Sequence, residues 1–146
     1  MTVILPASLA TAAACGIINL WLAIRVGQMR RAHAVSVGDG GNMAVIARMR
    51  AHANFIEYAP IVLILLVLLE LAWGTSAFLW ATGFAFVVAR VCHGLGMDTW
   101  KPGRAIGVGL TFPILLLLAG ACAWAASAVA STTPPAAIAV EAVPAA

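Results

Sequence analysis

Charged residues are scarce in this chain. Of its 146 residues, eight are Lys or Arg and five are Asp or Glu, so that 9% are charged, whereas 64% are hydrophobic. Soluble globular proteins carry about 25% charged residues and roughly half apolar residues. The composition therefore excludes an ordinary soluble domain and predicts an integral membrane protein, with a length that fits one compact domain.

Basic residues are too few and too scattered to predict nucleic-acid binding. The formal net charge is +3, but the Lys and Arg side chains lie between apolar segments rather than in one dense cluster. None occurs before Arg25, which argues against a secretory signal peptide, because such a peptide begins with a basic region. All eight fall into two zones, residues 25–50 and residues 90–104.

Cysteine and histidine are also few, with three of each. Cys15 and Cys122 lie within apolar runs, where a cysteine typically packs as a small apolar side chain. No two histidines have the i, i+4 spacing of a helical metal site. A haem held by His52 and His93 stays open as an alternative, but we expect no metal.

Four apolar segments are each long enough to cross a bilayer, because twenty helical residues span about 30 Å, the thickness of the hydrocarbon core. Together they predict an all-α four-transmembrane-helix bundle that forms one domain over residues 1–130. Residues 131–146 are rich in Ala and Pro and are predicted to be a disordered tail. The helices are expected at about residues 3–24, 43–72, 76–96 and 104–130.

A group of polar residues lies where the second apolar segment begins. Arg50, Asn54 and Glu57 are spaced i, i+4, i+7, so they share one face of a helix, and Pro60 follows one turn later. A charged side chain at this depth is costly and is expected to face a protein interior with a partner. The group is open to two compatible interpretations, a polar clamp between helices or a binding site.

Further basic residues are predicted to lie at the same depth. Arg90 and His93 are one turn apart near the end of the third segment, and Arg104 begins the fourth. Either arginine alone is explained by snorkelling toward lipid head groups. Together with Glu57 they would form an inward-facing set with more positive than negative charge, which favours an anionic ligand whose carboxylates Arg can bind in two places.

These residues resemble the MAPEG family, the membrane-associated proteins of eicosanoid and glutathione metabolism. The resemblance covers residues from about Asn19 to Thr111, and a glycine-rich loop at residues 38–41 is similar to the small bacterial branch of the family. It rests on one motif in each helix region: Gly27-Gln28-Met29-Arg30, then Arg50-x-His52-x-Asn54-x-x-Glu57-x-x-Pro60, Arg90-x-x-His93 and Pro102-Gly103-Arg104.

The resemblance implies a homotrimer in a bacterial inner membrane, with glutathione as co-substrate between neighbouring subunits near the cytoplasmic face. It implies a glutathione transferase or peroxidase that acts on lipophilic electrophiles, in which Arg104 is catalytic and stabilises the glutathione thiolate. Membrane lipids and a lipophilic small molecule would be its other partners, without nucleic acid. Position by position, the glutathione-binding residues would be Arg30, Arg50, Asn54, Glu57, Arg90, His93 and Arg104.

One position departs from the family pattern. Catalytic members commonly carry a tyrosine one turn after the arginine of the fourth helix, where this chain has Val108, and its single tyrosine is Tyr58. Two alternatives therefore stay open: a non-catalytic lipid- or ligand-binding membrane protein of the same architecture, and a small multidrug-type transporter. Against the transporter, Glu57 is expected nearer one face than the midplane, and the excess of Arg would repel cationic drugs.

We predict that both termini lie outside and that residues 28–43 lie in the cytoplasm, because four spans place both basic zones on the same side of the membrane. A reporter fused between Trp73 and Ser76 in a bacterial host is expected to behave as periplasmic. A fusion within residues 28–43 is the control with the opposite expected signal. Cytoplasmic behaviour of the first fusion would overturn this orientation.

Overall fold

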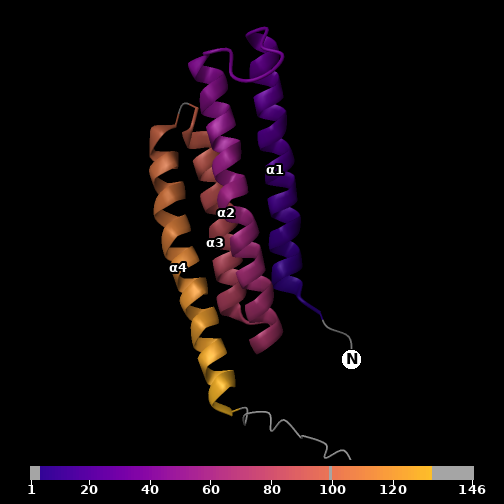
Figure 1. Cartoon of the computed structure of the whole chain (residues 1–146), viewed down its shortest axis with the longest axis vertical. Coiled ribbons are helices and arrows are strands. Elements are labelled where there is room, and N and C mark those ends of the chain that lie inside the picture. The colour runs from indigo at the N-terminus through magenta and orange to yellow at the C-terminus, as the bar shows by residue number, and fades with distance from the viewer. Residues whose placement is uncertain (1–3, 99, 133–146) are drawn as a thin grey trace, which may run out of the picture.

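The chain folds into a bundle of four long helices joined by short connections (Figure 1). The computed structural model describes residues 4–98 and 100–132. Successive helices run in opposite directions, so the α1–α2 and α3–α4 connections lie at one end of the bundle, called the basic end below (Figure 1). The helices are α1 (Pro6–Ala32), α2 (Met43–Trp73), α3 (Ala77–Gly96) and α4 (Lys101–Thr132).

All four helices are long and apolar enough to cross a membrane, which confirms the predicted four-helix architecture. α1 continues to Ala32, past the predicted end near residue 24, because the apolar run marks only the part suited to hydrocarbon. Its last turn contains Arg30 and Arg31, whose charges are favourable beside the carbonyl end of a helix. The predicted tail begins within the last two residues of α4, and residues 133–146 lie outside the described part of the chain.

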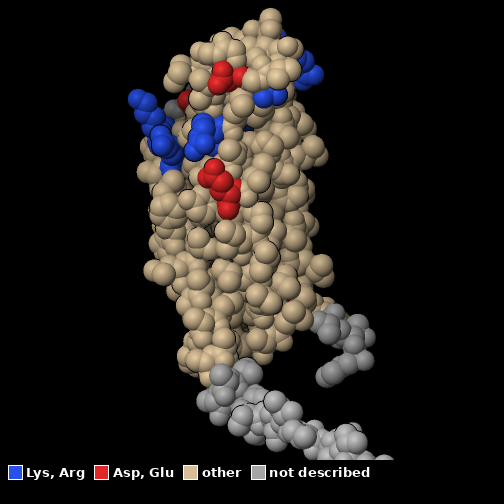
Figure 2. Space-filling model, viewed as in Figure 1, with Lys and Arg blue, Asp and Glu red and all other residues tan. Residues whose placement is uncertain are grey.

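Apolar side chains both fill the centre of the bundle and cover its outside. Leu22, Leu66, Phe86 and Leu118, one from each helix, are fully or almost fully buried. Many others face outward, such as Leu116 at 76% exposure. In the face shown in Figure 2, charged atoms gather toward the basic end and the rest of the surface is uncharged. Such a surface suits contact with lipid rather than water.

The start of α1 is capped by a residue of another helix. Leu5 occupies the N-cap position and makes no side-chain cap. Instead, the carboxylate of Glu70 on α2 accepts hydrogen bonds from the backbone N–H of Ala7 at 3.0 Å and of Ser8 at 2.8 Å, and the Thr75 hydroxyl donates to it at 2.8 Å. A negative charge is favourable at the amino end of a helix. Glu70, which is only 2% exposed, thus joins α1 to α2 at the end opposite the basic end.

Replacing Glu70 with Ala is expected to destabilise the fold by about 2 kcal/mol, because hydrogen bonds to a charged group contribute about 1.5–3 kcal/mol and the N–H groups of α1 would lose their acceptor. Unfolding in increasing mole fractions of SDS measures the loss. Thr75→Val removes one donor from the same carboxylate and should cost about 1 kcal/mol. A Glu70→Ala protein as stable as the parent would show that solvent replaces the cap.

Candidate functional site

The side chain of Arg90 lies inside the bundle and joins three helices. It extends from α3 and is 2% exposed. Its Nη1 donates to Asn54 Oδ1 on α2 at 3.0 Å, and its Nη2 donates to the Gly107 carbonyl on α4 at 3.0 Å. Nη2 also donates to the hydroxyl of Thr111, which in turn donates to the Gly107 carbonyl at 2.7 Å. Arg90 and Asn54, which the sequence placed at one depth, are therefore in direct contact.

Neutral groups surround this buried cation. The guanidinium carbon of Arg90 lies 5.8 Å from the centre of the Tyr58 ring and 5.5 Å from that of Phe86, and Tyr58 packs against Phe112 of α4. Within the described part of the chain, no carboxylate pairs with Arg90, and its buried Nε has no hydrogen-bond partner. Aromatic faces and neutral oxygens stabilise a cation without neutralising it. The region therefore keeps a positive charge that favours an anion.

His93, one turn beyond Arg90, is 5% exposed and packs against the backbone of α4. A side-chain carbon added at Gly107 would lie 2.5 Å from the Cβ of His93 and 2.8 Å from the Ala89 carbonyl oxygen. Gly107 thus lets α4 approach α3 closely enough for its carbonyl to reach Arg90. In the single chain, His93 is a packing residue between these two helices.

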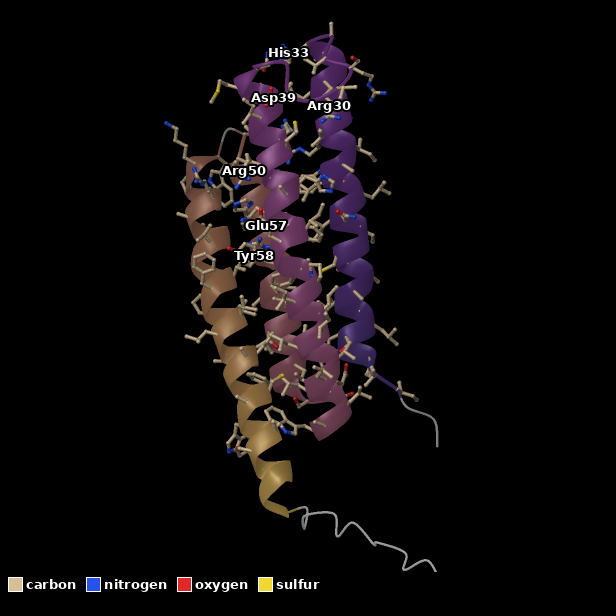
Figure 3. The ribbon with its side chains drawn as sticks, viewed as in Figure 1. Arg30, His33, Asp39, Arg50, Glu57 and Tyr58 are labelled. Carbon is tan, nitrogen blue, oxygen red and sulfur yellow. The ribbon has the colours of Figure 1, made fainter. Side chains whose placement is uncertain are left out.

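Three other predicted site residues lie on the outside of the single chain. Arg50, Glu57 and Arg104 are exposed, and in residues 4–98 and 100–132 the structure gives none of their side chains a hydrogen bond or an ion pair. Figure 3 shows Arg50, Glu57 and Tyr58 following one another along α2. The inward-facing set expected from the sequence is thus divided, because a helix in a bundle buries only the stripe that faces its neighbours.

Arg30, on α1, lines a cavity of about 420 Å³ between α1 and α2. Its guanidinium donates to Met49 Sδ at 3.6 Å, a weak acceptor, and its buried Nε has no partner among the described residues. His52 lines the same cavity, and its Nε2 lies 2.8 Å from Asn19 Oδ1 on α1. Ile56 also lines a second cavity of about 360 Å³ with mainly apolar walls. The groove between α1 and α2 therefore leads from a cationic side chain to an apolar region.

Two of these contacts were missed by the sequence analysis. Thr111 is uncharged and lies within a long apolar segment, where a single hydroxyl carries little information. Its one available signal is that it follows Arg104 by seven residues, which places both on the same side of α4. Asn19 gave a clearer signal as an amide within an apolar helix, but its partner could not be deduced. In the described residues, no group of three or more His, Cys, Asp or Glu side chains could hold a metal ion.

Known proteins resemble this chain over most of its length. The sequence model of the MAPEG family matches residues 8–124, a range that includes Arg30, Glu57 and Arg104. The inner membrane protein YecN of Escherichia coli, in strains K12 and O6:H1, is 28% identical over 101 residues, which cover 66% of this chain and 75% of the relative.

Proposed function

This chain belongs to the MAPEG family, and on that basis we propose that it is a membrane-embedded glutathione-binding protein. It acts as a glutathione transferase, or peroxidase, on lipophilic electrophiles through a thiolate stabilised by Arg104. The working form is a homotrimer whose glutathione sites lie between neighbouring subunits. It resides in the bacterial inner membrane, as the name of the Escherichia coli relative suggests, with the basic end in the cytoplasm and both termini outside.

The observation that carries this proposal is the set of unpaired charges on the outside of a membrane-spanning chain. Glu57 lies sixteen residues before Trp73, the last residue of α2, and is therefore roughly 24 Å from the outer end of that helix. A carboxylate at this depth is costly unless a cation faces it. Arg50 and Arg104 are also exposed. A second subunit and a charged ligand together would give all three their partners.

Glutathione offers two carboxylates, one ammonium and one thiol, and the candidate site has a suitable group for each. Arg30 and Arg50 suit the carboxylates, because a guanidinium donates two parallel hydrogen bonds to such a group. Glu57 suits the ammonium. The buried charge of Arg90 adds a positive field, and His93, one turn further along α3, is also buried.

Asn54 connects the buried Arg90 to the proposed ligand site. Its Oδ1 accepts from Arg90 at 3.0 Å. Its amide nitrogen has no acceptor among the described residues and can donate to a ligand carboxylate. Because Arg90 is held in turn by α4, the orientation of this amide is fixed before the ligand binds. Preorganised donors of this kind lose little entropy on binding.

Arg104 is the candidate for thiol activation. A free cysteine thiol has a pKa near 8.5, and an adjacent guanidinium stabilises the thiolate. The exposed Arg104 side chain lies in the first turn of α4 at the basic end, where glutathione from the cytoplasm would arrive. The lipophilic second substrate would enter from the bilayer along the groove between α1 and α2, whose deeper cavity has apolar walls.

A second candidate is a non-catalytic lipid- or ligand-binding protein of the same architecture. Val108 favours it, because the hydroxyl that a tyrosine would supply at this position of α4 is missing. The two candidates differ in one observable, the ionisation of the bound thiol.

Arg104→Ala is expected to leave assembly intact and to reduce the thiolate of bound glutathione by about tenfold, because an arginine at a chain surface can be removed without stranding a buried partner. Ultraviolet thiolate absorbance during a glutathione titration measures the ionised fraction, and calorimetry in parallel measures the affinity. Lys101→Ala, also exposed in the first turn of α4, is the matched control and should change neither. Unchanged thiolate absorbance in Arg104→Ala would favour the non-catalytic function over the glutathione transferase.

Glu57→Gln removes a charge without changing the shape of the side chain. Glu57 is exposed in the single chain, so the helices of each subunit should remain folded. Glutathione affinity should fall about tenfold or more because the ammonium of glutathione loses its carboxylate partner, and assembly should weaken because cations of the neighbouring subunit lose their counter-charge. Native mass spectrometry from detergent should show fewer trimers. A parent protein that is monomeric and still binds glutathione would disprove the site between subunits.

A further inference from the structure

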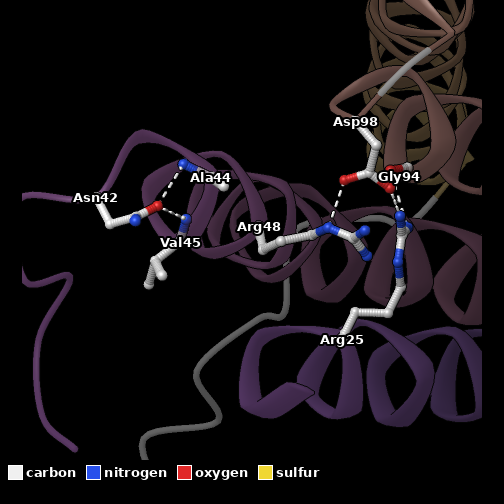
Figure 4. Close-up of polar contacts among 7 residues, drawn as sticks. All are labelled: Arg25, Asn42, Ala44, Val45, Arg48, Gly94 and Asp98. Carbon is white, nitrogen blue, oxygen red and sulfur yellow. Dashed lines mark hydrogen bonds and ion pairs between the residues drawn. The ribbon is translucent and has the colours of Figure 1, made fainter. Parts of the chain in front are cut away.

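A second arginine network lies at the basic end, outside the proposed glutathione site. The carboxylate of Asp98, in the α3–α4 connection, forms ion pairs with Arg25 of α1 and Arg48 of α2 (Figure 4). Its side chain is 14% exposed, and those of the two arginines are 10% and 19% exposed. Arg25 also donates to the Gly94 carbonyl at 3.0 Å. One carboxylate thus holds two mostly buried cations.

This network fixes the corner between α3 and α4 to the rest of the bundle. Arg25 lies 4.5 Å above the centre of the Trp21 ring, which holds the guanidinium from the side of α1. The Gly94 carbonyl belongs to the last turn of α3, where carbonyl groups have no partner within the helix. The ends of α1, α2 and α3 therefore meet at Asp98. Removing its charge would leave Arg25 and Arg48 repelling each other.

Arg104 lies next to the same corner between α3 and α4. A side-chain carbon added at Gly96 would collide with the backbone nitrogen of Arg104 and the carbonyl carbon of Gly103. The last turn of α3 and the first turn of α4 are therefore in direct backbone contact, and the Gly103 N–H donates to the Trp100 carbonyl at 2.9 Å. The backbone at Arg104 therefore packs directly against the end of α3 at Gly96.

One turn further along α4, the helix is held by hydrogen bonds from Arg90. The Gly107 carbonyl accepts from Arg90 at 3.0 Å, three residues after Arg104. The start of α4 is thus held at two points. Its first turn packs against the end of α3, which Asp98 joins to Arg25 and Arg48, and Gly107 in the next turn binds Arg90. Arg104 lies between these two anchors and has an exposed side chain.

We propose that Asp98 is a positioning residue, which holds the first turn of α4 through Arg25 and Arg48 so that Arg104 meets the glutathione thiol. The inference rests on the proposed function for the role of Arg104. It adds a residue of the α3–α4 connection that touches neither glutathione nor the second substrate. Asp98 acts on thiol ionisation rather than on glutathione affinity, since the carboxylates of glutathione bind elsewhere.

Three variants of the full-length protein test this role. Asp98→Asn removes the charge, and Asp98→Glu restores it with one more methylene. Asp39→Asn is the matched control, because it makes the same charge change at the same end. In its loop, the carboxylate accepts a local hydrogen bond from the Gly41 N–H at 2.8 Å and has no ion pair among the described residues. Hydrogen exchange of the amides from residues 100–107, thiolate absorbance and calorimetric glutathione affinity are measured on each variant.

In Asp98→Asn, these amides should exchange about tenfold faster, because the corner opens locally more often. The thiolate fraction of bound glutathione should fall by about threefold or more, because Arg104 no longer holds its place beside the thiol. Glutathione affinity should change by less than about twofold, since its carboxylate ligands are intact. Asp98→Glu should recover most of both signals, and Asp39→Asn should change neither.

Faster exchange with an unchanged thiolate fraction would overturn the inference, because Asp98 would then stabilise the corner without positioning Arg104. Unchanged exchange in Asp98→Asn would overturn it as well. If the parent protein binds no glutathione, the proposed function fails, and the exchange comparison still decides whether Asp98 holds the first turn of α4.

Discussion

The buried guanidinium of Arg90 is the group on which the arrangement of α2, α3 and α4 depends. It binds Asn54 on one neighbour and the Gly107 carbonyl on the other. Gly107 must remain a glycine for this to occur, because a side chain there would collide with His93. In the apolar part of a membrane, no water is available to solvate a cation in this position. Its hydrogen bonds therefore fix the register of three helices at the level of the candidate site.

Apart from Arg90 and Arg30, the charged side chains described above fall into two classes. Glu70, Asp98, Arg25 and Arg48 find partners within the chain and lie at the two ends of the bundle. A second class, which includes Glu57, is exposed on the apolar outside and has no ion pair within the described residues. The first class stabilises a single subunit. The second class has no partner within one subunit, and the proposed assembly and ligand would supply its partners.

Much of the architecture could be predicted from sequence because it depends on local properties. Apolar segments of about twenty residues define membrane spans, and the distribution of Lys and Arg places both basic zones at one end, as Figure 1 confirms for the two connections. The motif around Asn54 and Glu57 correctly identified the family. These features need only residue type and spacing.

The partners could not be predicted, because they join residues far apart in sequence. Glu70 binds the N–H groups of Ala7 and Ser8, more than sixty residues away, and nothing in its apolar surroundings indicates an acceptor for a helix end. Asp98 is a single acid in a short connection. Its partners Arg25 and Arg48 lie in the basic zone of residues 25–50, which the sequence analysis explained by the orientation of the chain in the membrane. Spacing also gave Glu57 and Arg90 the same depth without showing that one is exposed and the other buried.

The same contacts bear on how this chain could activate a thiol without a tyrosine at position 108. Thr111 is the nearest hydroxyl on α4 to Arg90, but its proton is given to the Gly107 carbonyl and its oxygen accepts from Arg90. It has no proton left for a thiolate. The Tyr58 ring is packed between Arg90 and Phe112, and these two contacts set its orientation. Under the proposed function, stabilisation of a thiolate by α4 would therefore fall to Arg104, and its effect would depend on how firmly the first turn of that helix is held.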